Sequence, residues 1–312
     1  MGGINGKTGR DAPGARFPTP RSTMPTPLPI NFAPTGMVPT KEMTPHVPLS
    51  VSEVVDEVRQ AWGVGITVVH LHARDDAGRP THDPAVYGAM IGQIRSFAPE
   101  LVVCVSLSGR ADPNLASRMA PLALDGDLKP DMASLTLSSL NFANQASCNA
   151  PDVVRALASE MLARRILPEL EIFDLGMASY ARHLAEKGLL LGPHYANIIL
   201  GNLATAQLDA GHLGILLRDL PGDTTWALGG LGRFQLPANQ IGIALGGGVR
   251  VGLEDNLFWN AERRDLATNL ALLQRIHDLA RLAGRPVMSP RDFRSRLGLV
   301  PGFGAYGRPP RP

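Results

Sequence analysis

Two histidines stand two residues apart in an otherwise apolar stretch, "VVHLHARDD" at residues 68–76. Because successive side chains of a β-strand point to opposite faces, His70 and His72 share one face, and Val69 and Leu71 share the other. Two neutral imidazoles on one face supply half of a four-coordinate metal site. The pair can also be interpreted as core histidines that hydrogen-bond to backbone carbonyls, so the spacing alone leaves both interpretations open.

A second cluster of charged residues lies in "VRVGLEDN" at residues 249–256. Arg250 and Glu254 share a face of the predicted strand, and Asp255 follows directly after it. Charged side chains are seldom buried unless they are paired or bound to a metal. Two imidazoles and one carboxylate would form the open three-ligand arrangement of a catalytic zinc, although other divalent metals fit the same set. A buried ion-pair network that fixes the strand register is the alternative.

The elements that must position these residues are predicted from the alternation of short apolar runs with longer amphipathic ones. Ser50 is the predicted N-cap of a helix at 50–63, with Glu53 three residues further on. Other helices are predicted at 151–165 and 265–284. The near-continuous apolar runs are typical of strands in a parallel sheet covered on both faces. The predicted strands are 30–36, 65–75, 101–108, 132–139, 170–176, 196–202, 224–230 and 247–255.

Eight strands, each followed by a helix, predict an α/β protein with one domain, a (β/α)8 or TIM barrel. An open doubly wound sheet would need a glycine-rich dinucleotide turn after its first strand, and "APTGMVPTK" contains none. Functional residues of such barrels lie at the C-terminal ends of the strands. The other polar residues at these positions are Ser106, Ser108, Thr136, Ser138, Asn141, Glu169 and Glu171. Cys104 is expected in the core, and His46, His82, His183, His194, His212 and His277 on the surface or in loops.

Composition excludes several classes of protein. The net charge is +2 and no Lys/Arg cluster is interleaved with aromatics, so nucleic-acid binding has no support. The two cysteines form no CxxC pair, which favours a reducing, cytoplasmic location. No apolar run reaches about 18 residues, so no membrane span is expected. Residues 1–26 are predicted to be a disordered tail, 27–300 the catalytic barrel and 301–312 a flexible tail.

Five stretches of the chain resemble the β-keto acid cleavage enzyme family: "APTGMVPT", "VVHLHARD", "SLNF", "PELEIFD" and "GGGVRVGLEDN". The resemblance covers about residues 29–300. It implies a zinc-binding TIM barrel, commonly a homotetramer. It also implies an acyltransferase that converts a β-keto acid and acetyl-CoA into acetoacetate and a new acyl-CoA.

By matching motif, the resemblance implies that His70, His72 and Glu254 are the zinc ligands. Asp255 would then be the general base, with Arg250 and Ser106 holding and polarising it. Glu171 would be a further active-site acid. The groups expected to hold the substrate carboxylate are Ser108, Thr136, Ser138 and Asn141.

The sequence departs from the family's pattern at two positions. Many members read "TGAE" after the first strand, where a glutamate faces an amino-bearing substrate, but here "TGMV" places Val38 at that position. An ammonium group would lose its counter-charge beside Val38, so an uncharged or apolar substrate tail is expected. Gly248 stands where the family often has a histidine.

Two further functions remain open from the sequence. One is a non-catalytic barrel that binds a metal or ligand, and the other is a metal-dependent aldolase or hydrolase that acts on a keto acid without CoA. An amidohydrolase is disfavoured, because the strands at 170–176 and 196–202 do not end in histidine.

Overall fold

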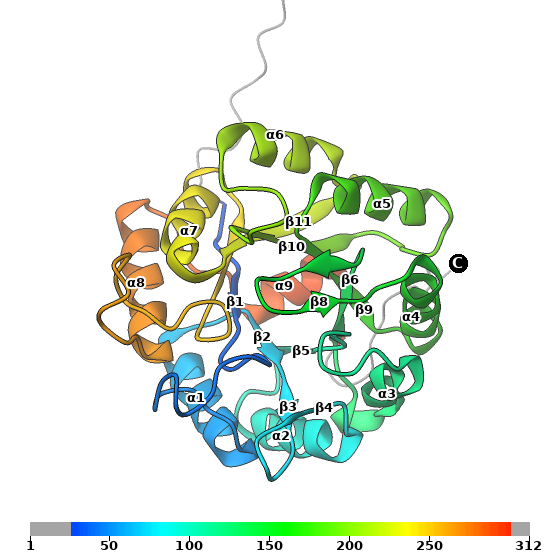
Figure 1. Cartoon of the computed structure of the whole chain (residues 1–312), viewed down its shortest axis with the longest axis horizontal. Coiled ribbons are helices and arrows are strands. Elements are labelled where there is room, and N and C mark those ends of the chain that lie inside the picture. Colours follow the sequence, from blue (N-terminus) through cyan, green and yellow to red (C-terminus); the bar gives the residue numbers. More distant parts are fainter. Residues whose placement is uncertain (1–25, 301–312) are drawn as a thin grey trace, which may run out of the picture.

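The computed structural model describes residues 26–300, and its strands close into a parallel barrel (Figure 1). Around the barrel the order is β1, β12, β11, β10, β9, β6, β5, β2, which confirms the predicted (β/α)8 architecture. The strands are β1 Ile30–Phe32, β2 Val68–Leu71, β5 Val102–Val105, β6 Met132–Thr136, β9 Leu167–Ile172, β10 His194–Leu200, β11 Thr224–Gly230 and β12 Gly248–Val251. Of the tail predicted at 1–26, residues 1–25 lie outside the described residues, and so does the whole tail predicted at 301–312.

A ring of helices surrounds the strands and covers the outer face of the barrel (Figure 1). Within residues 26–300, no helix is both long and apolar enough to cross a membrane. The α-helices are α1 Val51–Val64, α2 Pro84–Phe97, α3 Leu115–Met119, α4 Pro151–Arg164, α5 Leu175–Glu186, α6 Ala210–Asp219, α7 Gln235–Ala244, α8 Asn269–Leu282 and α9 Pro290–Leu297. Short 3-10 helices span Ala120–Ala123, Gly126–Leu128 and Gly232–Phe234.

Local sequence signals explain where several helices begin. Ser50 and Glu53 form the predicted capping box at the start of α1, and Pro151 is the first residue of α4. The strand predicted at 170–176 is wrong at both ends, because β9 starts at Leu167 and the chain is already helical at Leu175. Asp174 caps α5 by accepting a hydrogen bond from the backbone N–H of Gly176, and this cap ends the extended segment.

Helix α9, which the sequence did not predict, closes one end of the barrel. Phe293 packs edge-on against Tyr195 inside the barrel, with ring centroids 5.1 Å apart. Arg294 forms an ion pair with buried Asp131 at 2.6 Å and also donates to the carbonyls of Glu100 and Leu101. These partners lie at the N-terminal ends of the strands, so α9 is the floor and the opposite end is the mouth.

Two short hairpins follow barrel strands and shape the mouth. One pairs β3 (Ala73–Arg74) with β4 (Pro80–Thr81), and the other pairs β7 (Leu140–Asn141) with β8 (Ala146–Ser147). The β7–β8 hairpin lies across the barrel opening in the view along the barrel (Figure 1). It therefore forms one wall of the cavity described below.

Candidate active site

Three metal-binding atoms come together at the mouth, from the end of β2 and from the segment after β12. His70 Nε2 lies 3.3 Å from His72 Nε2, and His72 Nε2 lies 3.1 Å from Glu254 Oε1. His70 Nε2 lies 4.0 Å from Glu254 Oε2. Two ligands at about 2.0–2.1 Å from a tetrahedral zinc are about 3.3 Å apart. Barrel closure creates this arrangement, because β2 and β12 flank β1 on its two sides.

Two glycines allow Glu254 to reach this position. Gly252 has a φ of +150°, and a Cβ there would lie 2.0 Å from the carbonyl oxygen of Ala33. Gly36 has a φ of +73°, and a Cβ there would lie 2.5 Å from Glu254 Cγ. Both backbone conformations are strained for other residues. The "TG" and "VGLED" segments therefore need these glycines for the carboxylate to enter the site.

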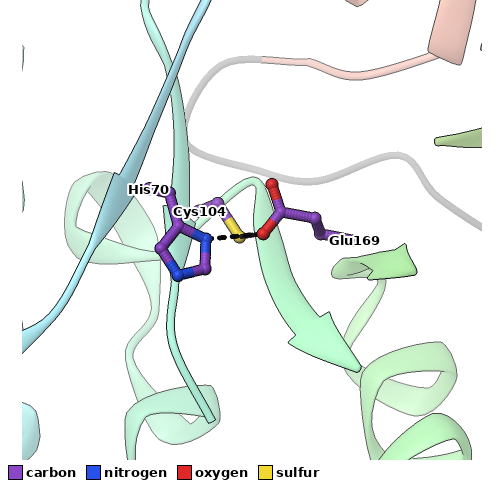
Figure 2. Close-up of side chains that lie close together, drawn as sticks. All are labelled: His70, Cys104 and Glu169. Atoms are coloured by element: carbon purple, nitrogen blue, oxygen red, sulfur yellow. Dashed lines mark hydrogen bonds and ion pairs between the residues drawn. The ribbon is translucent and has the colours of Figure 1, made fainter. Parts of the chain in front are cut away.

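A buried glutamate orients His70 from behind (Figure 2). His70 Nδ1 lies 2.5 Å from Glu169 Oε2, and Cys104 donates to the same oxygen at 3.3 Å. Asn31 Nδ2 donates to Glu169 Oε1 at 2.6 Å. Because a carboxylate only accepts hydrogen bonds, the His70 Nδ1 carries a proton and the lone pair of the neutral ring lies on Nε2. A carboxylate behind a metal-binding histidine is the usual supporting arrangement.

A second cluster of candidate ligands, His70, Cys104 and Glu169, is the one drawn in Figure 2. Burial raises the pKa of Cys104 well above its ordinary value, and the Glu169 carboxylate raises it further, so sulfur remains a thiol. Glu169 Oε2 already binds both His70 and Cys104. This cluster therefore supports His70, and Cys104 lies in the core, where the sequence places it.

The charges around the site favour the metal-binding forms of His72 and Glu254. Burial lowers the pKa of His72, which keeps this imidazole neutral. Burial would raise the pKa of Glu254, but Arg250 and the two histidines hold it well below its ordinary value. For His70, burial lowers the pKa, yet the Glu169 and Glu254 carboxylates raise it overall. The result is a carboxylate beside two ring nitrogens.

One unpartnered oxygen supports a divalent metal at these residues. Glu254 Oε2 is buried and has no hydrogen-bond partner among the described residues. It faces His70 Nε2, which is a lone-pair atom in the neutral ring. Two electron-rich atoms in such positions are stabilised by a cation between them, and buried anionic oxygens are otherwise costly. His70, His72 and Glu254 are the residues that would hold it.

Asp255 lies next to this group and is oriented by Arg250. Arg250 Nε donates to Asp255 Oδ2 at 2.8 Å, and Arg250 Nη2 lies 2.7 Å from Glu254 Oε1. The guanidinium is buried and thus fixes both carboxylates relative to each other. Burial raises the pKa of Asp255, an effect that Arg250 only partly offsets.

A cavity of about 510 Å³ opens in front of these groups and contains most of the predicted site residues. Those lining it are Val38, His72, Ser106, Ser108, Thr136, Glu171, Arg250, Glu254 and Asp255. Ser138 and Asn141 line a second cavity, of about 480 Å³, instead. The structure therefore does not bring these two together with the rest.

Three further expectations are modified by the structure. Ser106 was expected to hold Asp255, but in the described part of the chain its hydroxyl accepts from the Ser108 backbone and makes no bond to Asp255. Thr136 donates its hydroxyl proton to Glu171 Oε2 at 2.6 Å, so this proton is not available for a hydrogen bond to the substrate. His194 was expected on the surface or in a loop, which is wrong: it begins β10 and is buried.

Two residues for which the sequence predicts no role are prominent in the site. Glu169 supports His70, and its only signal was its position two residues before Glu171 on one face of a strand. Arg110 lines the cavity and stacks on Phe142. In the sequence Arg110 is a single arginine after a strand end, and such a residue alone does not indicate a binding role.

The fold and site define a TIM barrel with a candidate metal centre and a candidate base at the mouth. Residues 27–299 match the family of beta-keto acid cleavage enzymes, and the chain belongs to this family. It is accordingly an enzyme, a carbon–carbon bond-cleaving acyltransferase, and the non-catalytic alternative is set aside.

Similarity to individual proteins extends over nearly the whole chain. The chain is 37% identical over 291 residues to 3-oxoadipate:acetyl-CoA acetyltransferase of Cupriavidus necator, covering 92% of this chain and 100% of that protein. It is 32% identical over 272 residues to 3-keto-5-aminohexanoate cleavage enzyme of Fusobacterium nucleatum, covering 86% and 97%. The apo structure of ObcA has a TM-score of 0.70 at 19% identity, covering 81% of this chain and 66% of that one, and supports the fold alone.

Proposed function

We propose that this enzyme uses acetyl-CoA to cleave a β-keto acid into acetoacetate and a new acyl-CoA. The observation that carries the proposal is the pair of adjacent carboxylates after β12. Glu254 belongs to a cluster of metal-binding atoms, while Asp255 faces the same cavity, and one buried arginine holds both. A base beside a metal site is what proton removal next to a ketone needs.

The metal that we propose is zinc, held by His70, His72 and Glu254. When bound, it would act as a Lewis acid that polarises a carbonyl oxygen, an effect worth several kcal/mol. The nitrogen-rich ligand set favours zinc over magnesium or calcium, which prefer oxygen ligands.

Asp255 accepts a proton from the carbon between the keto and carboxylate groups of the substrate. Arg250 keeps the Asp255 carboxylate directed into the cavity through its bond at 2.8 Å. Ser106 and Ser108 are the hydroxyl donors available to the substrate carboxylate, since Thr136 donates to Glu171. Ser138 and Asn141 were predicted to hold the substrate carboxylate. This stays a prediction, although both residues line the second cavity.

The carbanion left by proton removal attacks the carbonyl carbon of acetyl-CoA and expels the CoA thiolate. The thiolate then attacks the former keto carbon of the acid. The bond between that carbon and the original α-carbon breaks, and reprotonation of the α-carbon gives acetoacetate. The remaining acyl group leaves as the new thioester, so every bond broken is matched by one formed.

Val38 narrows the class of substrate. Its side chain lines the cavity and carries no charge, so an ammonium group on the substrate would have no counter-charge there. The uncharged or apolar substrate tail therefore stays a prediction, and what Val38 supports directly is the absence of a cation. The relative from Cupriavidus necator is named for 3-oxoadipate, which has a second carboxylate. A Val38→Glu variant should shift the kcat/KM ratio toward amino-bearing β-keto acids, and an unchanged ratio would remove Val38 from substrate selection.

The experiment that tests the proposed function is a panel of β-keto acids incubated with and without acetyl-CoA. Formation of acetoacetate together with a new thioester, only when acetyl-CoA is present, is the expected result. Keto-acid consumption without acetyl-CoA would instead support the aldolase or hydrolase alternative.

We also propose a cytoplasmic homotetramer, as the family resemblance suggests. Cys104 and Cys148 are both free thiols, which agrees with a reducing compartment. Light scattering during size-exclusion chromatography measures the mass of the assembly, and a monomer mass would contradict the proposal.

A further inference from the structure

Arg110 presents an unpaired cation to the active-site cavity. It follows β5 and its guanidinium carbon lies 3.4 Å from the centroid of the Phe142 ring. Within residues 26–300, its guanidinium has no hydrogen-bond or ion-pair partner, and its Nε is buried without one. The residue is half-buried and lines the cavity, so its other donors are free to bind a ligand that enters there.

Four other arginines are bound by groups of the protein, although Arg74 Nε and Arg250 Nη1 are also buried without a partner among the described residues. Arg250 is paired with Asp255 and Glu254, and Arg294 with Asp131. Arg118 and Arg74 donate to backbone carbonyls. Arg110 differs from these four in that none of its guanidinium donors has a hydrogen-bond or ion-pair partner within residues 26–300, which leaves them available to a molecule entering the cavity.

A guanidinium fork matches a carboxylate, which it binds through two parallel hydrogen bonds. The cavity already has groups for the reacting end of the substrate, at Asp255 and Ser108. Arg110 instead contacts the β7–β8 hairpin, through the Phe142 ring and through its own carbonyl, which accepts from Gln145. Apolar Leu140 lies on the same hairpin and lines the cavity beside Phe142, which suits the methylene chain of a substrate.

We propose that Arg110 is a specificity-determining residue that binds a second, distal carboxylate of the substrate, so that the preferred substrate is a β-keto diacid. This inference rests on the proposed function and deepens it. It agrees with Val38, which offers no counter-charge to a cationic tail, but it replaces the expected uncharged or apolar tail by an anionic one.

The test compares two substrates of equal length, a six-carbon β-keto diacid and the six-carbon β-keto monoacid with a terminal methyl group. Wild-type enzyme should have the higher kcat/KM with the diacid. Arg110→Gln should reduce the diacid-to-monoacid ratio about 10- to 100-fold, because a hydrogen bond to a charged group is lost. Arg59→Gln is the matched control: Arg59 also stacks on a phenylalanine, Phe97 at 4.0 Å, but on the outside of the barrel. It should keep the wild-type ratio.

Several results would overturn the inference. Equal losses with both acids would place Arg110 on the carboxylate that they share. A raised KM for acetyl-CoA with both acids would place it on the co-substrate. The absence of a diacid preference in wild type would also refute it, and this measurement depends on no variant.

Failure of the proposed function gives a different result. If wild type forms no thioester from either acid, calorimetric binding of the two acids without acetyl-CoA still decides the role of Arg110. Tighter binding of the diacid by wild type, lost in Arg110→Gln and kept in Arg110→Lys at least in part, supports the inference. Equal binding of the two acids overturns it.

Discussion

Replacing Glu169 by glutamine should weaken metal binding although Glu169 touches no metal. The carboxylate accepts from His70 Nδ1 on one oxygen and from Asn31 Nδ2 on the other, at 2.5 and 2.6 Å. Glutamine has the same shape but one oxygen becomes an N–H₂ donor. If the donor faces Asn31, two donors meet. If it faces His70, it forces the proton from Nδ1 to Nε2 and removes the lone pair that a metal needs.

The expected loss of metal affinity is about 10- to 100-fold, or about 1.4–2.7 kcal/mol, which is typical when the partner of a metal-binding histidine is removed. Competition with a fluorescent zinc chelator measures the affinity. Glu171→Gln is the matched control, because Glu171 lies on the same strand and bonds to Thr136 rather than to a histidine. Equal affinities in wild type and Glu169→Gln would refute the reasoning, and so would an equal loss in the control.

Three other changes have defined outcomes. Asp255→Asn should lower the rate of thioester formation about 10²- to 10⁴-fold while zinc content stays unchanged, and retained activity would exclude Asp255 as the base. Arg294→Met should lower the free energy of unfolding by about 3–5 kcal/mol in urea titrations, because buried Asp131 loses its 2.6 Å ion pair and keeps only Arg95 at 3.5 Å; a loss below 1 kcal/mol would contradict this. Burial would raise the pKa of Glu53, but Lys41 and two backbone amides lower it from 4.5 to about 2. The stabilisation that Glu53→Gln removes should therefore be complete above pH 4.5 and disappear as pH falls toward 2, and a difference independent of pH would contradict the assignment.

The barrel could be predicted from the sequence because its strands are short apolar runs separated by amphipathic helices of regular length. Strand ends were predicted less well, since polar caps such as Asp174 end an extended segment without breaking the apolar pattern. Helix α9 was missed because most of its residues are polar. Its burial depends on Phe293 and Arg294 meeting Tyr195 and Asp131, which are distant in the sequence.

The candidate site could also be predicted only in part. His70 and His72 share a face because of strand periodicity, and a sequence reveals that directly. The contact between His70 and Glu169 joins residues 99 apart in the chain, so only the closed barrel shows it. Ser138 and Asn141 lie beyond a strand end, where the path of the hairpin rather than periodicity decides which cavity they face.

The most direct test of the proposed reaction is the fate of the acetyl group of acetyl-CoA. Acetyl-CoA labelled with ¹³C at both acetyl carbons is incubated with the enzyme and the preferred β-keto acid, and the products are analysed by mass spectrometry. Acetoacetate should carry both labelled carbons as its terminal acetyl unit, while the acyl group of the new thioester should be unlabelled. Unlabelled cleavage products, with the labelled acetyl-CoA left intact, would contradict the proposed reaction.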